Sequence, residues 1–272
     1  MSAKIQIVLF FYFVFWQLER FIFRLLMLEY SKSIHTDAPG PNKEAASLVS
    51  SYPKVPLTVD CVIFGFINNT LNVLLIKSDL AQFKDELSLL GDMVQSNEDL
   101  DTAANRVLLE RTGMHNVFLE QVHTFSKVDR HPGGRVITTV YASLLNFKHQ
   151  AFKIHENELK WHEVNHISSM AFDHKHILDV CYTWLQKRIQ EHPLAFSLLP
   201  EKFSLRQLQN VYEAILNTKL DRRNFRKKFA SMGLLIDTNE MEVNVTHRPG
   251  KLYQFDYAQY ETSKRNWVGI DF

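Results

Sequence analysis

The spacing of apolar positions predicts that the first folded region of the chain begins with a β-hairpin. Segments 57–67 and 71–78 are rich in valine, isoleucine, leucine and phenylalanine, and each has the length of an ordinary strand. Asn68, Asn69 and Thr70 separate the two segments, and asparagine is a residue that tight hairpin turns favour. We therefore expect these strands to pair directly with each other.

The pattern then changes to a helical period. Apolar residues that recur three and four positions apart between residues 98 and 112 predict a helix, and Gly113 is placed to end it. A short segment at 88–94 precedes this helix, and two further strands are expected at 117–126 and 135–145. This order of elements predicts an α+β domain with a mixed sheet.

The C-terminal part of the chain has a different organisation. Segments 174–190, 205–217 and 222–233 all have periods near that of a helix, and a hairpin pattern follows at 234–256. Three helices followed by a β-hairpin are typical of a winged helix-turn-helix domain. We therefore expect a first domain over residues 53–168 and a winged helix domain over residues 171–262.

The N-terminal residues 1–52 stand apart from both predicted domains. The apolar run at 5–16 is shorter than the roughly 20 residues that cross a bilayer. Three interpretations stay open: translated upstream sequence with the true start at Met27, a membrane-associating segment within residues 1–28, or an amphipathic helix packed on the body. The stretch at 31–56 is rich in serine, proline, glycine and alanine, which is typical of a linker or an extended arm.

Composition adds little to this picture. The formal net charge is +1, so any signal for a nucleic-acid partner has to be local. Cys61 and Cys181 each lie in an apolar run, without the spacing of a zinc site or a disulfide scaffold. Buried, reduced thiols in a cytoplasmic protein are the expectation.

A known motif covers the turn and helix of the first domain. The segment GDMVQSNEDLDTAANRVLLERTGM at 91–114 resembles the Nudix signature, and the resemblance extends over roughly residues 55 to 165. It implies a Nudix-like α/β/α sandwich around a mixed sheet. The signature positions that match are Glu98, Arg106, Glu110, Gly113 and Met114, while Gly91 lies one residue too far upstream.

Two departures from the signature remove its chemistry. Active members use glutamates four residues apart on one helix face to hold Mg²⁺ against a pyrophosphate. Val107 and Arg111 occupy those positions here, and neither offers an oxygen ligand. The resemblance implies that Arg106 and Glu98 form a structural pair that braces the loop onto the helix. We therefore expect no metal, no cofactor and no catalytic residue, and hence a domain that senses a ligand without cutting it.

Three other carboxylates near the signature have two interpretations. Asp92, Asp99 and Asp101 are candidate metal ligands, and they would be needed for any remaining hydrolysis. They also fit a solvated loop and the first turn of a helix, where the helix dipole favours acids.

The candidate effector-binding residues lie in two later segments. Asp129, Arg130 and Arg135 belong to the loop VDRHPGGRV at 128–136, where they would bond sugar hydroxyls or phosphates. The alternative is a charged hairpin tip with an internal salt bridge. Trp161 lies in an acidic, helix-like stretch (HENELKWHEV), and it is either a stacking partner for a ligand or a partly buried edge residue.

The most informative segment is the third helix of the winged region. Asp221 is a suitable N-cap, and Phe225, Phe229 and Met232 form an apolar stripe. Residues 200–232 contain eight basic and three acidic residues, a local charge of +5. A basic helix face is often only solvated, but this one follows a helix and a short turn and precedes a hairpin. The candidate DNA-binding residues are Arg206, Arg222, Arg223, Asn224, Arg226, Lys227 and Lys228, with Arg248 and Lys251 on the hairpin.

Residues 171–260 resemble the C-terminal domain of the Nudix-related transcriptional regulators. The segment FSLLPEKFSLRQLQNVYEAILNTKLDRRNFRKKF, the later KLYQFD and the junction sequence AFDH at 171–174 carry this resemblance. It implies a cytoplasmic homodimer on double-stranded, palindromic operator DNA, released by an effector such as ADP-ribose or a pentose. A Nudix hydrolase of a nucleoside diphosphate derivative is the alternative function, and a membrane-tethered sensor is a third that rests only on the N-terminal segment.

Overall fold

The computed structural model describes residues 50–78, 80–115, 117–145, 159–246, 248–263 and 269–270. The expectations for the apolar N-terminal run, the start at Met27 and most of the linker lie outside these residues. Residues from Val55 onward form one compact unit, which contains all the elements named below.

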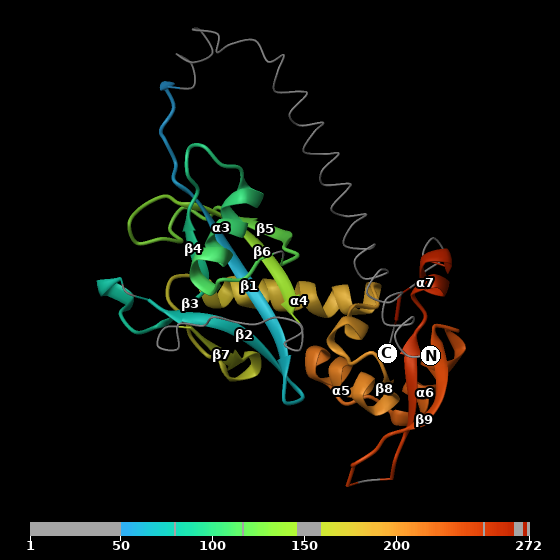
Figure 1. Cartoon of the computed structure of the whole chain (residues 1–272). Helices are drawn as coiled ribbons and strands as arrows, with labels where there is room; N and C mark the ends of the chain where they lie inside the picture. Colours follow the sequence, from blue (N-terminus) through green and yellow to red (C-terminus); the bar gives the residue numbers. More distant parts are fainter. Residues whose placement is uncertain are drawn as a thin grey trace. The chain divides into compact units, whose positions relative to one another are not determined.

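The first part of this unit contains a mixed sheet and two long helices (Figure 1). Its strands are β1 (Leu57–Ile67), β2 (Thr70–Lys77), β3 (Leu87–Ser88), β4 (Leu90–Met93), β5 (Glu120–Phe125), β6 (Ile137–Leu145) and β7 (Leu159–Glu163). Its helices are α3 (Leu100–Thr112) and α4 (His174–Glu191), with 3-10 turns at Ala81–Phe83 and Val164–His166.

Strand β1 organises the sheet. Its second half pairs antiparallel with β2, its first half pairs antiparallel with β4, and β6 runs parallel to it. Asn68 and Asn69 both have positive φ, 50° and 64°, which is the backbone that a tight hairpin turn needs. The predicted hairpin and the mixed sheet are therefore confirmed.

The two faces of β1 carry different layers. Val59 and Cys61 are buried in one apolar cluster with Val107 of α3. The alternate residue Val62 is buried in a second cluster with Ile177 of α4. Because successive side chains of a strand point to opposite faces, α3 and α4 cover the two sides of the sheet. This is the α/β/α sandwich that the resemblance to the Nudix signature implied.

Strand β7 corrects one expectation. The described residues of the helix-like stretch that contains Trp161 are not a helix, because Leu159–Glu163 pair antiparallel with β2. Leu159 is buried, Lys160 is exposed and the last three residues are partly buried, and the strand pairs with β2. Pairing with β2 overrides the local pattern here. Trp161 is half-buried in this edge strand, in agreement with the simpler of its two interpretations.

The second part of the unit is a winged helix. It comprises a 3-10 turn (Leu194–Leu198), β8 (Phe203–Ser204), α5 (Leu205–Leu216), α6 (Arg222–Ser231), β9 (Leu235–Met241), β10 (Lys251–Phe255) and α7 (Tyr257–Ser263). Strand β10 pairs antiparallel with both β8 and β9. Ser204 and Gln207 form a capping box at the start of α5. The predicted helices and hairpin are confirmed, and β8 is an additional strand.

Helix α4 belongs to both parts. On the sheet side, the ring of His176 meets Phe125 of β5 at 5.6 Å between centroids, and Arg188 pairs with Glu120 at 3.1 Å. On the other side, Gln186 Nε2 donates to the carbonyl of Ile215 in α5 at 3.2 Å. One continuous apolar cluster contains residues of β1, α4, α5 and α6.

Both cysteines are free thiols in the core, as expected. Burial raises the pKa of Cys181 to about 12, and it also raises that of Cys61 well above its usual range. Within the described part of the chain, the helices lack the combination of length and apolar character that crossing a bilayer requires.

Candidate functional site

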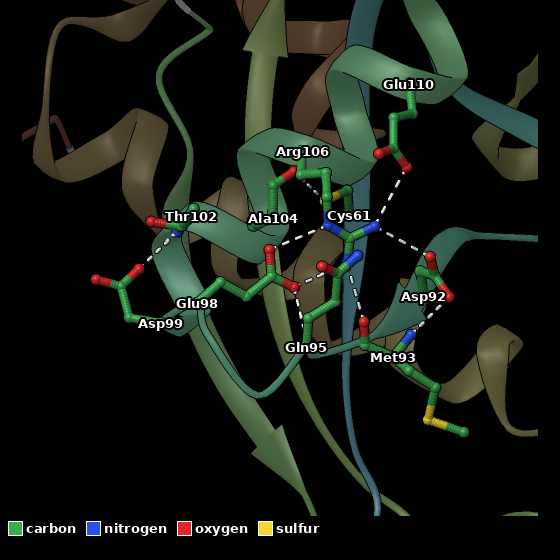
Figure 2. Close-up of polar contacts among 10 residues, drawn as sticks. All are labelled: Cys61, Asp92, Met93, Gln95, Glu98, Asp99, Thr102, Ala104, Arg106 and Glu110. Atoms are coloured by element: carbon green, nitrogen blue, oxygen red, sulfur yellow. Dashed lines mark hydrogen bonds and ion pairs between the residues drawn. The ribbon is translucent and has the colours of Figure 1, made fainter.

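Arg106 is the centre of a polar cluster at α3 (Figure 2). Its Nε and Nη2 donate to the two oxygens of Glu98 at 3.0 and 2.9 Å. Its Nη1 donates to Asp92 at 3.1 Å and to Glu110 at 3.2 Å, and Nη2 also reaches the carbonyl of Met93 at 2.9 Å. The hydrogen bond from Arg106 is the main reason why the pKa of Glu98 is lowered. The brace between loop and helix that the resemblance implied is present.

This cluster does not fit a magnesium ion. Mg²⁺ needs several free oxygen ligands in near-octahedral geometry, whereas Arg106 already bonds three carboxylates. Val107 is 1% exposed and faces the apolar core, and Arg111 brings a positive charge. Among the described residues, no group of three or more histidine, cysteine, aspartate or glutamate side chains is arranged to hold a metal.

The acids of the first helical turn have structural partners. Asp99 caps α3, because its side chain accepts from the backbone N–H of Thr102 at 2.8 Å. Asp101 accepts from the hydroxyl of Tyr141 at 2.6 Å. These contacts favour the helix-start interpretation of both residues over a metal site. Gly113 ends the same helix with φ of 69°, as predicted.

A pocket of about 210 Å³ lies where β1, β4, the end of α3 and the start of α4 meet. Of the four sequence candidates for effector binding, Arg130 alone lines it, while Asp129, Arg135 and Trp161 do not. From the Nudix segment, the lining includes Gly91 and Arg111. Other polar groups in the wall are Thr58, Asp60, Ser78, Ser88, Asp92, His131 and His174.

A buried carboxylate forms one wall of this pocket. Asp60 is 5% exposed, and its Oδ2 accepts from the hydroxyl of Thr138 at 2.6 Å. Nε2 of His174 lies 3.7 Å from the other oxygen, Oδ1. His174 Nδ1 accepts from the backbone N–H of Leu89 at 3.1 Å, so the proton of a neutral ring is on Nε2, facing Asp60. Burial lowers the pKa of His174, which favours that neutral form.

Gly91 is required at the wall because of how closely β4 approaches β1. A Cβ at this position would lie 2.2 Å from Asp60 Oδ1 and 2.9 Å from the carbonyl of Val59. We expect Gly91→Ala to lower the free energy of unfolding by about 1–3 kcal/mol, the usual cost of overpacking. Urea denaturation followed by circular dichroism measures this. A change below 0.5 kcal/mol would contradict the close approach.

The junction sequence AFDH connects the pocket to α4. Arg130 is buried, and its Nε and Nη2 donate to the two oxygens of Asp173 at 2.9 and 2.7 Å. Phe172 has a positive φ of 54°, and its ring contacts those of His131 and His174 at centroid distances of 5.1 and 5.0 Å. Arg130 is therefore a buried wall residue of the pocket, and its ion pair is with Asp173 at the start of α4 rather than within the hairpin tip.

Sequence reasoning missed Asp60, Thr138 and the role of His174. One signal was available for Asp60, because it is a single acid within the otherwise apolar strand LTVDCVIFGFI. A buried acid in such a strand needs partners, but the sequence does not say which residues supply them.

Helix α6 presents a cationic face. Asp221 caps the helix by accepting from the N–H of Asn224 at 2.8 Å, as predicted, and Phe225 and Phe229 are each 1% exposed in the core. The helix carries four exposed cations, Arg222, Arg223, Arg226 and Lys227, and none of them forms an ion pair within the described residues. Helical spacing places the last three away from the buried phenylalanines, whereas Arg222 is exposed as the first residue of the helix.

The remaining candidate DNA-binding residues lie beside the cationic face of α6 or on other elements. Asn224 and Lys228 line a second cavity of about 590 Å³ beside α4 and the end of α5, so they flank the cationic face. Arg206 is half-buried in the first turn of α5. On the hairpin, Arg248 is exposed, and Lys251 pairs with Asp237 at 2.7 Å.

Comparison with known proteins identifies both parts of the chain. The model of the NUDIX domain matches residues 55–185, and that of the NrtR DNA-binding winged helix domain matches residues 195–255. The ADPR responsive transcriptional repressor NtrR of Acinetobacter baylyi is 33% identical over 217 residues, which cover 78% of this chain and 86% of that protein. An ADP-ribose pyrophosphatase of Methanocaldococcus jannaschii is 29% identical over 122 residues, 44% of this chain and 71% of that enzyme.

A solved structure contains the same two parts. The crystal structure of Shewanella oneidensis NrtR complexed with a 27mer DNA matches with a TM-score of 0.63 and 27% identity, over 75% of this chain and 95% of that one. The family follows from this structural match, from the two domain models that match in the same order along the chain, and from the relative in Acinetobacter. The chain belongs to the NrtR family of transcriptional regulators, in which a Nudix-type domain precedes a winged helix DNA-binding domain.

Proposed function

We propose that this regulator represses transcription by binding operator DNA through α6, and that ADP-ribose releases it. The observation that carries the proposal is the cationic face of α6 in the same compact unit as a pocket lined by the Nudix segment. The relative from Acinetobacter is named as an ADPR responsive repressor, which supports ADP-ribose as the effector and repression as the outcome.

The exposed cations divide into two roles. Arg222, Arg223 and Arg226 lie in the first half of α6, the part of a recognition helix that enters the major groove. Arginine pairs with guanine in bidentate fashion, and Asn224 at the edge of this face is suited to adenine. The second role is contact with the DNA phosphates, which falls to Lys227, Lys228, Arg206, Arg248 and Lys251. The protein acts as a homodimer, so that two such helices read two half-sites of a palindrome.

Helix α4 transmits the signal. Its first residue, His174, lines the pocket, and Gln186 and Gln190 near its other end line the cavity beside α6. A ligand that displaces the AFDH segment therefore moves a helix that contacts the winged domain directly. A coupling free energy of about 1–3 kcal/mol between the two sites is typical of such a connection.

The effector is bound and not hydrolysed in this proposal. A related protein is an ADP-ribose pyrophosphatase, but the residues around Arg106 do not fit the metal that such chemistry needs. Hydrolase activity is therefore the alternative that the experiment has to separate.

The test begins by selecting bound DNA from random sequence, which supplies an operator. Gel-shift titrations then measure release by ADP-ribose, NAD and arabinose, and chromatography measures the ADP-ribose recovered after incubation with Mg²⁺. We expect ADP-ribose to release the DNA and to be recovered intact. Conversion of ADP-ribose to AMP would overturn the non-catalytic assignment, and failure of ADP-ribose to affect DNA binding would overturn the effector.

A further inference from the structure

Arg111 differs from the other two arginines of the pocket region. Arg106 bonds three carboxylates, and Arg130 bonds Asp173 with two of its nitrogens. Arg111 is exposed in the last turn of α3, lines the pocket and forms no ion pair within the described residues. Its guanidinium is therefore available to a ligand.

The positive charge of Arg111 is suited to neutralising a diphosphate ligand in this pocket. A diphosphate carries two or more negative charges, and Nudix enzymes neutralise them with metal ions. The residues here do not fit a metal. Arg106 forms ion pairs with the three nearby carboxylates, as Figure 2 shows, and Val107 faces the core. A guanidinium binds phosphate oxygens through two parallel hydrogen bonds and keeps its charge at all physiological pH values.

We propose that Arg111 replaces the metal in this protein and binds the diphosphate of the effector directly. The inference rests on the proposed function, because it takes ADP-ribose as the ligand of the pocket. Its consequence is recognition of a nucleoside diphosphate sugar without any divalent cation. Arginine in place of the glutamate of the Nudix signature at position 111 then has two effects. It removes a metal ligand, and it supplies the positive charge that the metal would have brought.

A second charged residue of the pocket wall, Asp60, sets the orientation of the ligand. Asp60 is a buried carboxylate, so a diphosphate beside it would be repelled. Sugar hydroxyls are hydrogen-bond donors and are suited to that wall, which Thr138 and His174 hold in place. The diphosphate therefore lies toward Arg111 and a ribose toward Asp60.

Isothermal titration of the full-length protein with ADP-ribose tests the inference. The titration is run in buffer with EDTA and in buffer with Mg²⁺, for the wild type and for Arg111→Ala, Arg111→Lys and Lys77→Ala. Lys77 is a matched control, because it is exposed next to the wall residues Ile76 and Ser78 without lining the pocket. Thermal melts check that each variant is folded.

We expect wild-type affinity to agree within about twofold between the two buffers, since no metal takes part. Arg111→Ala should weaken ADP-ribose binding by about tenfold to hundredfold, the usual effect of losing hydrogen bonds to a charged group. Arg111→Lys should recover part of the loss, and Lys77→Ala should match the wild type.

Two results would overturn the role of Arg111 while leaving the proposed function intact. One is wild-type binding that EDTA abolishes, and the other is an Arg111→Ala variant that binds as tightly as the wild type. If the wild type binds no ADP-ribose in either buffer, the proposed effector itself is wrong, and the inference falls with it.

Discussion

Replacing Arg223 with alanine is expected to weaken operator binding by about 1–3 kcal/mol, roughly fivefold to 150-fold, and to relax the base preference at one position. Arg223 lies on the side of α6 opposite the buried Phe225 and Phe229 and in the first half of the helix, so its side chain is placed to enter a groove. Fluorescence anisotropy with the selected operator and with single-base variants measures both effects.

Two comparisons make this result specific. Lys227→Ala should weaken binding to all sequences alike and reduce the slope of log affinity against log salt by about 1, because it contacts a phosphate. Lys187→Ala removes an exposed cation of α4 that pairs with Glu191, and it should change neither quantity. Unchanged operator affinity in Arg223→Ala would remove this residue from the interface.

Replacing Asp173 with alanine is expected to lower the free energy of unfolding by about 3–5 kcal/mol. The reason is the position of its partner, because the Arg130 side chain is 4% exposed and would keep a buried charge without its carboxylate. Denaturation by urea, monitored by fluorescence and by circular dichroism, gives the value. The variant should also lose the response of DNA binding to ADP-ribose, since the pocket wall and the start of α4 meet at this pair.

A matched control exists on the same helix. Asp179 also forms a short ion pair, with Lys175 at 2.6 Å, but it is more than half exposed, and Asp179→Ala should cost at most about 1 kcal/mol. The double variant Arg130→Leu and Asp173→Leu should recover much of the loss, because it removes the buried charge together with its partner. Equal destabilisation by Asp173→Ala and Asp179→Ala would show that burial of Arg130 has no energetic consequence.

Elements defined by local chemistry were predictable from the sequence. The turn at Asn68 and Asn69 needs positive φ, Gly113 ends a helix, and Asp221 begins one. The stripe of Phe225 and Phe229 fixes which face of α6 is buried, and so it also fixes which cations are exposed. Each of these features depends on residues close together in the sequence.

Features that depend on distant partners were not predictable. Strand β7 has a helix-like sequence and is a strand only because β2 offers it an edge. Asp60, Thr138 and His174 come from three separate elements, and Arg130 meets Asp173 across 43 residues. A single sequence states that a buried acid or arginine needs a partner, but the fold decides which residue supplies it.

The helix that the two halves share sets a limit on how they can be recombined. Helix α4 packs against the sheet and against α5. In a chimaera that joins a sensor domain from another protein to this winged helix domain at residue 171, α4 would therefore pack against a sheet from a different protein. A junction after His192, where the helix ends, keeps α4 with its own sheet, but α4 would then contact an α5 helix from a different protein. Exchange of effector specificity in such regulators is therefore expected to proceed by substitution inside the pocket rather than by domain shuffling.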